Sequence, residues 1–208
     1  MSSVFNKYYK KYDFWYDTHQ FAFMSELQAI KNVFPKNRRS LEIGVGTGRF
    51  AAALKITIGI DPSLKMLRLA EKRGLNVYQG FGENIPFLHD AFDCVLIIIT
   101  LCFVDDPKKV IAEAARVLKK NGRIIIGIVD KNSFLGKYYQ RKKSIFYKQA
   151  KFISVKEVTD LLKNTGFGSI NYQQTISVRP EKMERVEKPK KGYGQGGFVI
   201  IAARKGFR

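Results

Sequence analysis

The sequence predicts an α/β protein organised around a doubly wound sheet. Between residues 40 and 130, short apolar stretches alternate with amphipathic stretches of helical period. The first apolar stretch ends in the turn Gly44-Val45-Gly46-Thr47-Gly48, which leads directly into a short alanine-rich helix. Glycine allows a tight strand-to-helix turn and close contact with a ligand. The chain of 208 residues is long enough for one such domain with a sizeable core.

Residues 1–35 form a predicted N-terminal helical cap. Aromatic and aliphatic residues recur here at spacings of three and four, as in Tyr8-Tyr12-Trp15 and Phe23-Leu27-Ile30. This spacing predicts two amphipathic helices packed on the main domain, with most of the aromatic side chains in the core. Pro35-Lys36-Asn37 breaks the chain before the first strand.

Residues 40–130 form the predicted core. The fourth apolar run, Phe92 to Ile99, is unbroken, as expected for a strand at the centre of a parallel sheet. Lys120-Asn121-Gly122 is predicted to turn the chain into the fifth strand. Strands are expected at residues 41–43, 57–61, 75–79, 92–99 and 123–129, with helices at 50–54 and 63–73 and after Pro107.

The remaining chain divides into two further parts. Residues 131–152 are aromatic and basic, which we interpret as an inserted helical lid over the active site. Residues 153–208 begin with a helix capped by Ser154. Two strands follow, at residues 170–178 and 198–203, and are expected to pair antiparallel at the sheet edge. The charged, glycine-rich stretch 179–197 is predicted to be a loop.

The glycine spacing indicates which ligand the turn holds. A dinucleotide fingerprint needs a third glycine where Arg49 stands, and no phosphate loop G-x-x-x-x-G-K-[ST] is present. Both phosphate-rich ligand classes are therefore disfavoured. Asp61 ends the second strand thirteen positions after Gly48, where a carboxylate can accept hydrogen bonds from both ribose hydroxyls. Capping of the helix that starts near Pro62 is a second, compatible role for this carboxylate.

The segment from Glu42 to Gly48 resembles the first motif of the class I S-adenosylmethionine (AdoMet)-dependent methyltransferases, acid-x-Gly-x-Gly-x-Gly. The similarity extends from about residue 40 to 130. It implies a Rossmann-like sheet of seven strands, mostly parallel with the last strand antiparallel, and AdoMet as cofactor. Residues 80–87 resemble the family's adenine-pocket segment, Gly-x-Ala-Glu-x-Leu-Pro-Phe. Gly82 takes the alanine position, and Phe81 stands where many members carry an aspartate.

The resemblance implies a set of residues around the cofactor. The residues expected there are Glu42, Gly44, Gly46, Gly48, Asp61, Pro62, Met66, Phe81, Gly82, Glu83, Ile98 and Thr100. The candidates on the substrate side, each of which packing alone would also explain, are Tyr12, Tyr16, His19, Cys102, Phe103 and Tyr139. No catalytic base is assigned, because the sulfonium of AdoMet is already activated and the protein mainly supplies alignment.

The acceptor class is inferred from motifs that are missing. Thr100-Leu101-Cys102-Phe103 stands where adenine-amino methyltransferases carry Asn/Asp-Pro-Pro-Tyr/Phe, and no Pro-Cys pair supplies a nucleophile for cytosine. The sequence therefore predicts AdoMet-dependent methyl transfer to a small molecule, such as an amine or a hydroxyl compound. Magnesium-dependent O-methylation through Asp130 and Asn132 is disfavoured because the fourth strand does not end in an acid, and we expect no metal.

Two alternatives remain open. One is an RNA methyltransferase that uses the basic lid and the C-terminal loop, since the net charge is +19 and much of the excess follows Asp130. A lysine-rich surface that only keeps the protein soluble explains the same charge. The other alternative is a non-catalytic AdoMet sensor or partner-binding protein.

The cellular setting is predicted from composition and from the N-terminus. The two cysteines are too few for a disulfide framework and suit a reducing compartment. The first residues carry no apolar signal-peptide core, and the apolar runs are too short to span a bilayer. We expect a cytoplasmic protein without a membrane partner, as a monomer or weak homodimer.

Overall fold

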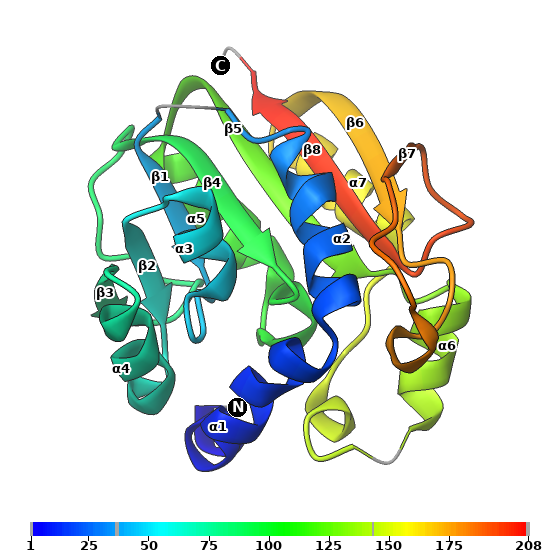
Figure 1. The fold of residues 1–208 in the computed structure, drawn as a ribbon. Helices are drawn as coiled ribbons and strands as arrows, with labels where there is room; N and C mark the ends of the chain where they lie inside the picture. Colours follow the sequence, from blue (N-terminus) through cyan, green and yellow to red (C-terminus); the bar gives the residue numbers. More distant parts are fainter. Residues whose placement is uncertain (1, 36–37, 143, 207–208) are drawn as a thin grey trace.

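The computed structural model describes residues 2–35, 38–142 and 144–206. These residues form an eight-stranded sheet with helices on both faces (Figure 1). The strands are β1 Ser40–Ile43, β2 Ile58–Asp61, β3 Asn76–Gln79, β4 Phe92–Ile98, β5 Leu118–Val129, β6 Phe167–Thr175, β7 Lys190–Lys191 and β8 Phe198–Lys205. Their order across the sheet is β3-β2-β1-β4-β5-β8-β6-β7.

The first five strands run parallel, and β8 runs antiparallel to both β5 and β6. This confirms the predicted doubly wound, mostly parallel sheet and its reversed last strand. The predicted number of seven strands omits the two-residue β7, which pairs with β6. The pairing of the last two long strands is also as predicted, but β8 lies inside the sheet rather than at its edge. Its first six residues, 198–203, are all buried, which suits an interior strand.

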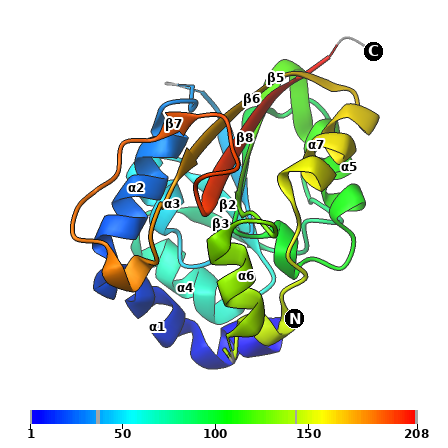
Figure 2. The same cartoon turned by 90° about the vertical axis from the view of Figure 1, so that its right-hand side faces the viewer.

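The helices divide between the two faces of the sheet. The helices are α1 Ser2–Thr18, α2 Gln20–Lys31, α3 Arg49–Leu54, α4 Leu64–Lys72, α5 Pro107–Val117, α6 Phe134–Arg141 and α7 Val155–Asn164. Figure 2 shows α5 and α7 on one face and α2, α3 and α4 on the other. Three short 3₁₀ turns complete the set, at Leu101–Phe103, Tyr147–Gln149 and Pro180–Lys182. Among the described residues, no helix combines the length and apolar character needed to cross a bilayer.

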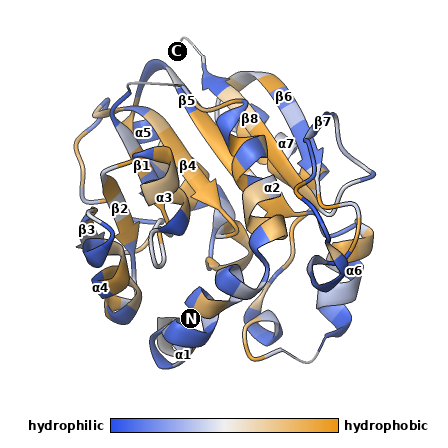
Figure 3. Cartoon of the chain, viewed as in Figure 1, coloured by the Kyte–Doolittle hydropathy of each residue, from blue (hydrophilic) through white to orange (hydrophobic). Residues whose placement is uncertain are grey.

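Strand β4 explains why the sequence carries an unbroken apolar run at the centre of the sheet. Cys94, Leu96 and Ile98 face the cluster that contains α2 and α3, whereas Val95 and Ile97 face the cluster that contains α5 and α7. Both faces of the strand are covered, so alternation with polar residues would place polar groups in a dry core. Figure 3 shows the same hydrophobic character in β4, β5 and β8.

The predicted boundaries of two strands are wrong. The strand expected at residues 170–178 is β6, which spans Phe167–Thr175. β5 begins at Leu118, ahead of the expected turn at residues 120–122. Leu118 already pairs with Phe92, and the register then shifts before Arg123 pairs with Cys94. Asn121 takes a left-handed conformation with φ 60°, which asparagine tolerates better than most residues. The turn-forming residues thus produce an irregularity within the strand instead of a loop before it.

Candidate active site

The glycine turn lies at the carboxyl ends of β1 and β2. Gly44, Gly46 and Gly48 all have positive φ, at 70°, 52° and 80°, a region that side chains disfavour. The backbone amides of Gly44 and Val45 both donate to the carbonyl oxygen of Ile60, at 2.8 and 3.0 Å. A Cβ added to Gly46 would meet no atom closer than the Sδ of Met66, at 3.8 Å. The turn therefore leaves a bare backbone surface open to a ligand.

Asp61 ties the two strand ends together. Its Oδ2 accepts a hydrogen bond from the Gly46 amide at 2.9 Å, and its Oδ1 accepts one from the Ser63 amide at 2.8 Å. A carboxylate offers about four acceptor positions, so one on each oxygen remains available. Burial raises the pKa of Asp61 to about 6, against the opposing effect of these two amides. The predicted capping role falls instead to Ser63, whose Oγ accepts from the Met66 amide.

The first cavity lies above this turn. All but two of the residues predicted around the cofactor line it; they are Gly44, Gly46, Asp61, Pro62, Met66, Phe81, Gly82, Glu83, Ile98 and Thr100. Phe81 is 60% exposed, so its ring stands at the rim. A Cβ on Gly82 would press on Ile43 and Val110, which explains why even alanine is crowded there.

Two predicted cofactor residues have other surroundings. Glu42 is buried and is not among the residues that line the first cavity. Burial raises its pKa to about 8 against a backbone hydrogen bond involving Ala51, and its Oε2 has no hydrogen-bond partner. Gly48 packs against Ala70 and Leu75, so a side chain there would push α3 away from α4.

The second cavity adjoins the first and has a volume of about 360 Å³. This size is in the range of small-molecule sites. Its walls come from α1, α2, the chain that leaves β4, the end of β5, Pro180 and residues within 135–142 and 144–153. Tyr16, Cys102 and Tyr139, predicted on the substrate side, line this cavity. Tyr12 and Phe103 line both cavities.

The boundary between the cavities is the chain that leaves β4. Ile99 and Thr100 line both cavities. Ile99 has φ 52°, a strained conformation for a β-branched residue, and its amide donates to the carbonyl oxygen of Gly127 at 2.8 Å. The Thr100 hydroxyl donates to the carbonyl oxygen of Ile98 at 3.0 Å, which turns its side chain towards Gly44.

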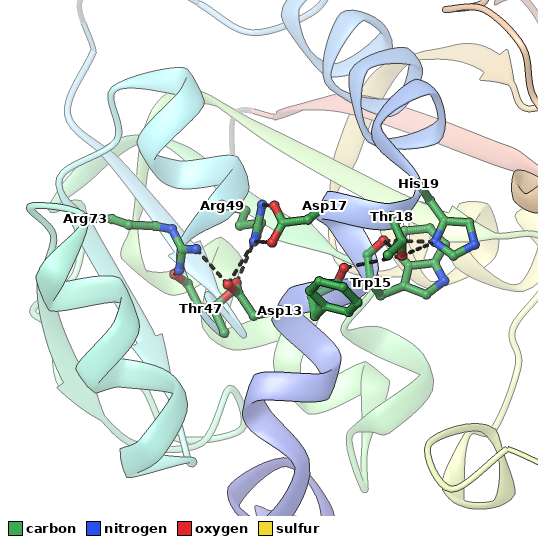
Figure 4. A network of polar contacts seen from close by, with 9 residues as sticks. Asp13, Trp15, Asp17, Thr18, His19, Thr47, Arg49 and Arg73 are labelled. Carbon is green, nitrogen blue, oxygen red and sulfur yellow. Dashed lines mark hydrogen bonds and ion pairs between the residues drawn. The ribbon is translucent and has the colours of Figure 1, made fainter.

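Helix α1 is fixed to the glycine turn by ion pairs (Figure 4). Arg49 donates two hydrogen bonds to Asp13, at 2.8 Å each, and two to Asp17, at 2.7 and 2.8 Å. Arg73 joins Asp13 to the carbonyl oxygen of Thr47, at 2.8 and 2.7 Å. Burial would raise the pKa of Asp13, but its hydrogen bonds hold it at about 2. Arg49, which breaks the dinucleotide fingerprint, thus anchors the N-terminal cap.

His19 is the predicted substrate-side residue that lines neither cavity. Its ring stacks on Trp15 with 4.5 Å between centroids, and Nδ1 lies 2.9 Å from both the Thr18 hydroxyl and the Trp15 carbonyl oxygen (Figure 4). Asp130 was considered above as a magnesium ligand. Its Oδ1 accepts hydrogen bonds from the backbone amides of Asn132 and Val155, at 3.3 Å each.

Several cavity residues are absent from the sequence-based prediction. Phe5 covers the first cavity, and its ring stacks on that of Phe146 at 5.6 Å. This contact joins α1 to the segment that the sequence predicts to be a lid. Glu26, Phe146 and Tyr147 line the second cavity. The aromatic content of both segments is the one available signal, and it does not distinguish a cavity wall from the core.

Comparisons with known proteins agree with this geometry. A family model described as a methyltransferase domain matches residues 41–126. The chain shares 46% sequence identity with a SAM-dependent methyltransferase from Thermotoga maritima whose crystal structure is known and which is described as a possible histamine N-methyltransferase. That match covers 99% of this chain and 100% of the other, with a TM-score of 0.96. The chain belongs to the AdoMet-dependent methyltransferases.

Other relatives span different parts of this methyltransferase. The uncharacterized protein MJ1123 of Methanocaldococcus jannaschii is 51% identical over 205 residues, covering 98% of this chain and 99% of the relative. A demethylmenaquinone methyltransferase of Thermotoga maritima is 34% identical over 125 residues, covering 54% of this chain and 53% of the relative. AdoMet is therefore the cofactor of this enzyme.

Proposed function

We propose that this enzyme transfers the methyl group of AdoMet to a small molecule bound in the second cavity. The observation that carries the proposal is that the two cavities share the walls Tyr12, Ile99, Thr100 and Phe103. A cofactor over the glycine turn and an acceptor beside Cys102 then meet across a single boundary. Holding two reactants in such a geometry supplies much of the rate enhancement of a group transfer.

The cofactor fits the first cavity through its adenosyl and methionine parts. The two unused acceptor positions of Asp61 suit the two ribose hydroxyls. The open backbone at Gly46 accommodates the methionine part, and Phe81 and Gly82 flank the adenine. Bound AdoMet supplies a methyl group on a positively charged sulfur. The role of the protein is to orient that group towards the second cavity and to exclude water with Phe5, Tyr12 and Phe103.

The acceptor is proposed to be an amine or a hydroxyl compound. A bond forms between the acceptor nitrogen or oxygen and the methyl carbon while the bond from that carbon to sulfur breaks. The sulfur becomes a neutral thioether, and the acceptor loses one proton to a base or to water. A related enzyme is named as a possible histamine N-methyltransferase, which supports a small acceptor of this kind.

The test is methyl transfer from isotope-labelled AdoMet to a panel of small amines, alcohols and phenols, followed by mass spectrometry. We expect label in at least one small molecule. Total RNA is included in parallel because of the net charge of +19. Label in RNA and in no small molecule would replace this proposal by the RNA alternative.

A matched pair of tyrosine variants locates the acceptor. Tyr139→Ala enlarges the second cavity, whereas Tyr193→Ala changes a tyrosine that is 52% exposed and lines neither cavity. We expect only the first to reduce turnover while binding of S-adenosylhomocysteine is retained. Equal turnover in both variants would place the acceptor elsewhere.

A further inference from the structure

Among the described residues, no cationic side chain pairs with one carboxyl group of the second cavity. Glu26 lies on α2, is 4% exposed and lines this cavity. Its Oε2 is buried without a hydrogen-bond partner. Leaving such an atom unsatisfied in a folded protein costs free energy, on the order of 1–3 kcal/mol. A group that arrives with a ligand can recover this cost.

The surroundings of Glu26 select the charge of that ligand. Glu26 is the one acidic side chain among the described residues that line the second cavity. Tyrosine rings form much of the wall, from Tyr12, Tyr16, Tyr139 and Tyr147. Ring faces attract cations, and the attraction strengthens when water is excluded. A carboxylate within aromatic walls is therefore suited to an ammonium group.

In the part of the chain that the structure describes, neither lysine that lines this cavity forms an ion pair with Glu26. Lys11 and Lys142 line the cavity but are themselves exposed to solvent. The Nζ of Lys142 also pairs with Glu181 at 3.1 Å. Burial raises the pKa of Glu26 to about 8, which agrees with a carboxyl that has no cationic partner of its own. Over residues 2–35, 38–142 and 144–206, the cavity thus offers one carboxyl without a counter-ion.

We propose that the acceptor is a small primary or secondary amine whose ammonium form pairs with Glu26 within the aromatic walls of the second cavity. Before methyl transfer the ammonium gives one proton to the Glu26 carboxylate, because the nitrogen needs a free lone pair to form the bond to the methyl carbon. The inference rests on the proposed function, because it names the substrate class of the same cavity. It assigns a binding role to a residue on the N-terminal cap. It also gives a role to an acid on the buried, mostly apolar face of α2.

The test compares amines with alcohols of the same shape. Benzylamine and 2-phenylethylamine, with benzyl alcohol and 2-phenylethanol as neutral counterparts, are titrated calorimetrically into the enzyme saturated with S-adenosylhomocysteine. We expect each amine that binds to do so at least about tenfold more tightly than its alcohol, the lower end of the range for a hydrogen bond to a charged group. No binding of either amine at millimolar concentration, or equal binding of amine and alcohol, overturns the proposal.

Two carboxyl variants supply the matched comparison. Glu26→Gln keeps the shape and removes the charge, and we expect it to reduce the amine-to-alcohol ratio to about twofold or less, since the charged-bond contribution is lost. Glu184→Gln changes an exposed glutamate that lines neither cavity. This variant should preserve the ratio. A ratio that survives in Glu26→Gln contradicts the assignment.

The outcomes separate this inference from the proposed function. Methylation of alcohols or phenols without amine preference removes the role of Glu26 and leaves the small-molecule function intact. Charge-selective amine binding without methyl transfer to any small molecule removes the function and leaves the binding site. The melting temperature of each variant is recorded, and Glu26→Leu serves as a second charge-free variant if Glu26→Gln does not fold.

Discussion

The ionisation of Asp61 should control cofactor affinity between pH 7.5 and pH 5. Burial raises the pKa of this carboxyl from 3.8 to about 6 in the free protein. Ribose hydroxyls donate hydrogen bonds, so they favour the ionised form. Acidification through pH 6 should therefore weaken the binding of S-adenosylhomocysteine. The contribution of Asp61 to the free energy of unfolding changes in the opposite direction and increases on acidification.

The size of the effect follows from the pKa. At pH 5, one unit below a pKa of about 6, roughly one carboxyl in eleven is ionised. If only that form binds the ribose, the apparent Kd rises about tenfold, or about 1.4 kcal/mol. For folding the sign is reversed. A raised carboxyl pKa gives a stability contribution that is full below 3.8 and is lost as the pH rises through about 6.

Isothermal titration of S-adenosylhomocysteine at pH 5, 6, 7 and 7.5 measures this dependence. Asp61→Asn is the control, because the amide is isosteric and does not titrate in this range. We expect weaker but pH-independent binding in the variant. A Kd for the unmodified enzyme that is constant from pH 5 to 7.5 would refute the proposed ribose contact.

Two further predictions concern the glycine turn and its anchor. Arg49→Gln should reduce the free energy of unfolding in urea by about 1–3 kcal/mol, because it removes charged hydrogen bonds to Asp13. The free energy of unfolding of Arg49→Lys should lie between those of the unmodified enzyme and Arg49→Gln, since lysine keeps the charge but lacks the guanidinium fork. An unchanged unfolding midpoint in Arg49→Gln would show that the ion pairs do not hold α1. Gly44→Ala should abolish measurable cofactor binding, because the new Cβ would overlap the Thr100 side chain at a φ of 70°. Gly74→Ala is the control, with a φ of 85° and no atom within 4 Å, and it should retain affinity.

The cofactor side of the site could be predicted because it is local in sequence. Three glycines within five residues impose the turn, and Asp61 follows at the end of the next strand. The glycines act through their backbone conformation and Asp61 acts through a carboxylate placed at a strand end, and a pattern of residue types records both. The strands of the sheet could be predicted for the same reason, since each is a single apolar run in the sequence.

The acceptor side could not be predicted because its walls come from segments far apart in the chain. Glu26 is a polar residue in an amphipathic helix, and only the packing of α2 against the sheet reveals that it is buried. Phe5 and Phe146 meet across more than half of the sequence. The position of β8 inside the sheet was not predicted either, because the order of strands depends on how the chain connects them and not on the residues of one strand.

The central claim is that the two cavities hold cofactor and acceptor on either side of Tyr12, Ile99, Thr100 and Phe103. A crystal structure of the enzyme with S-adenosylhomocysteine tests it most directly. We predict the ribose hydroxyls on Asp61, the adenine beside Gly82 and the sulfur facing that shared boundary. A ligand whose sulfur points to solvent, or one bound away from the glycine turn, would contradict the account.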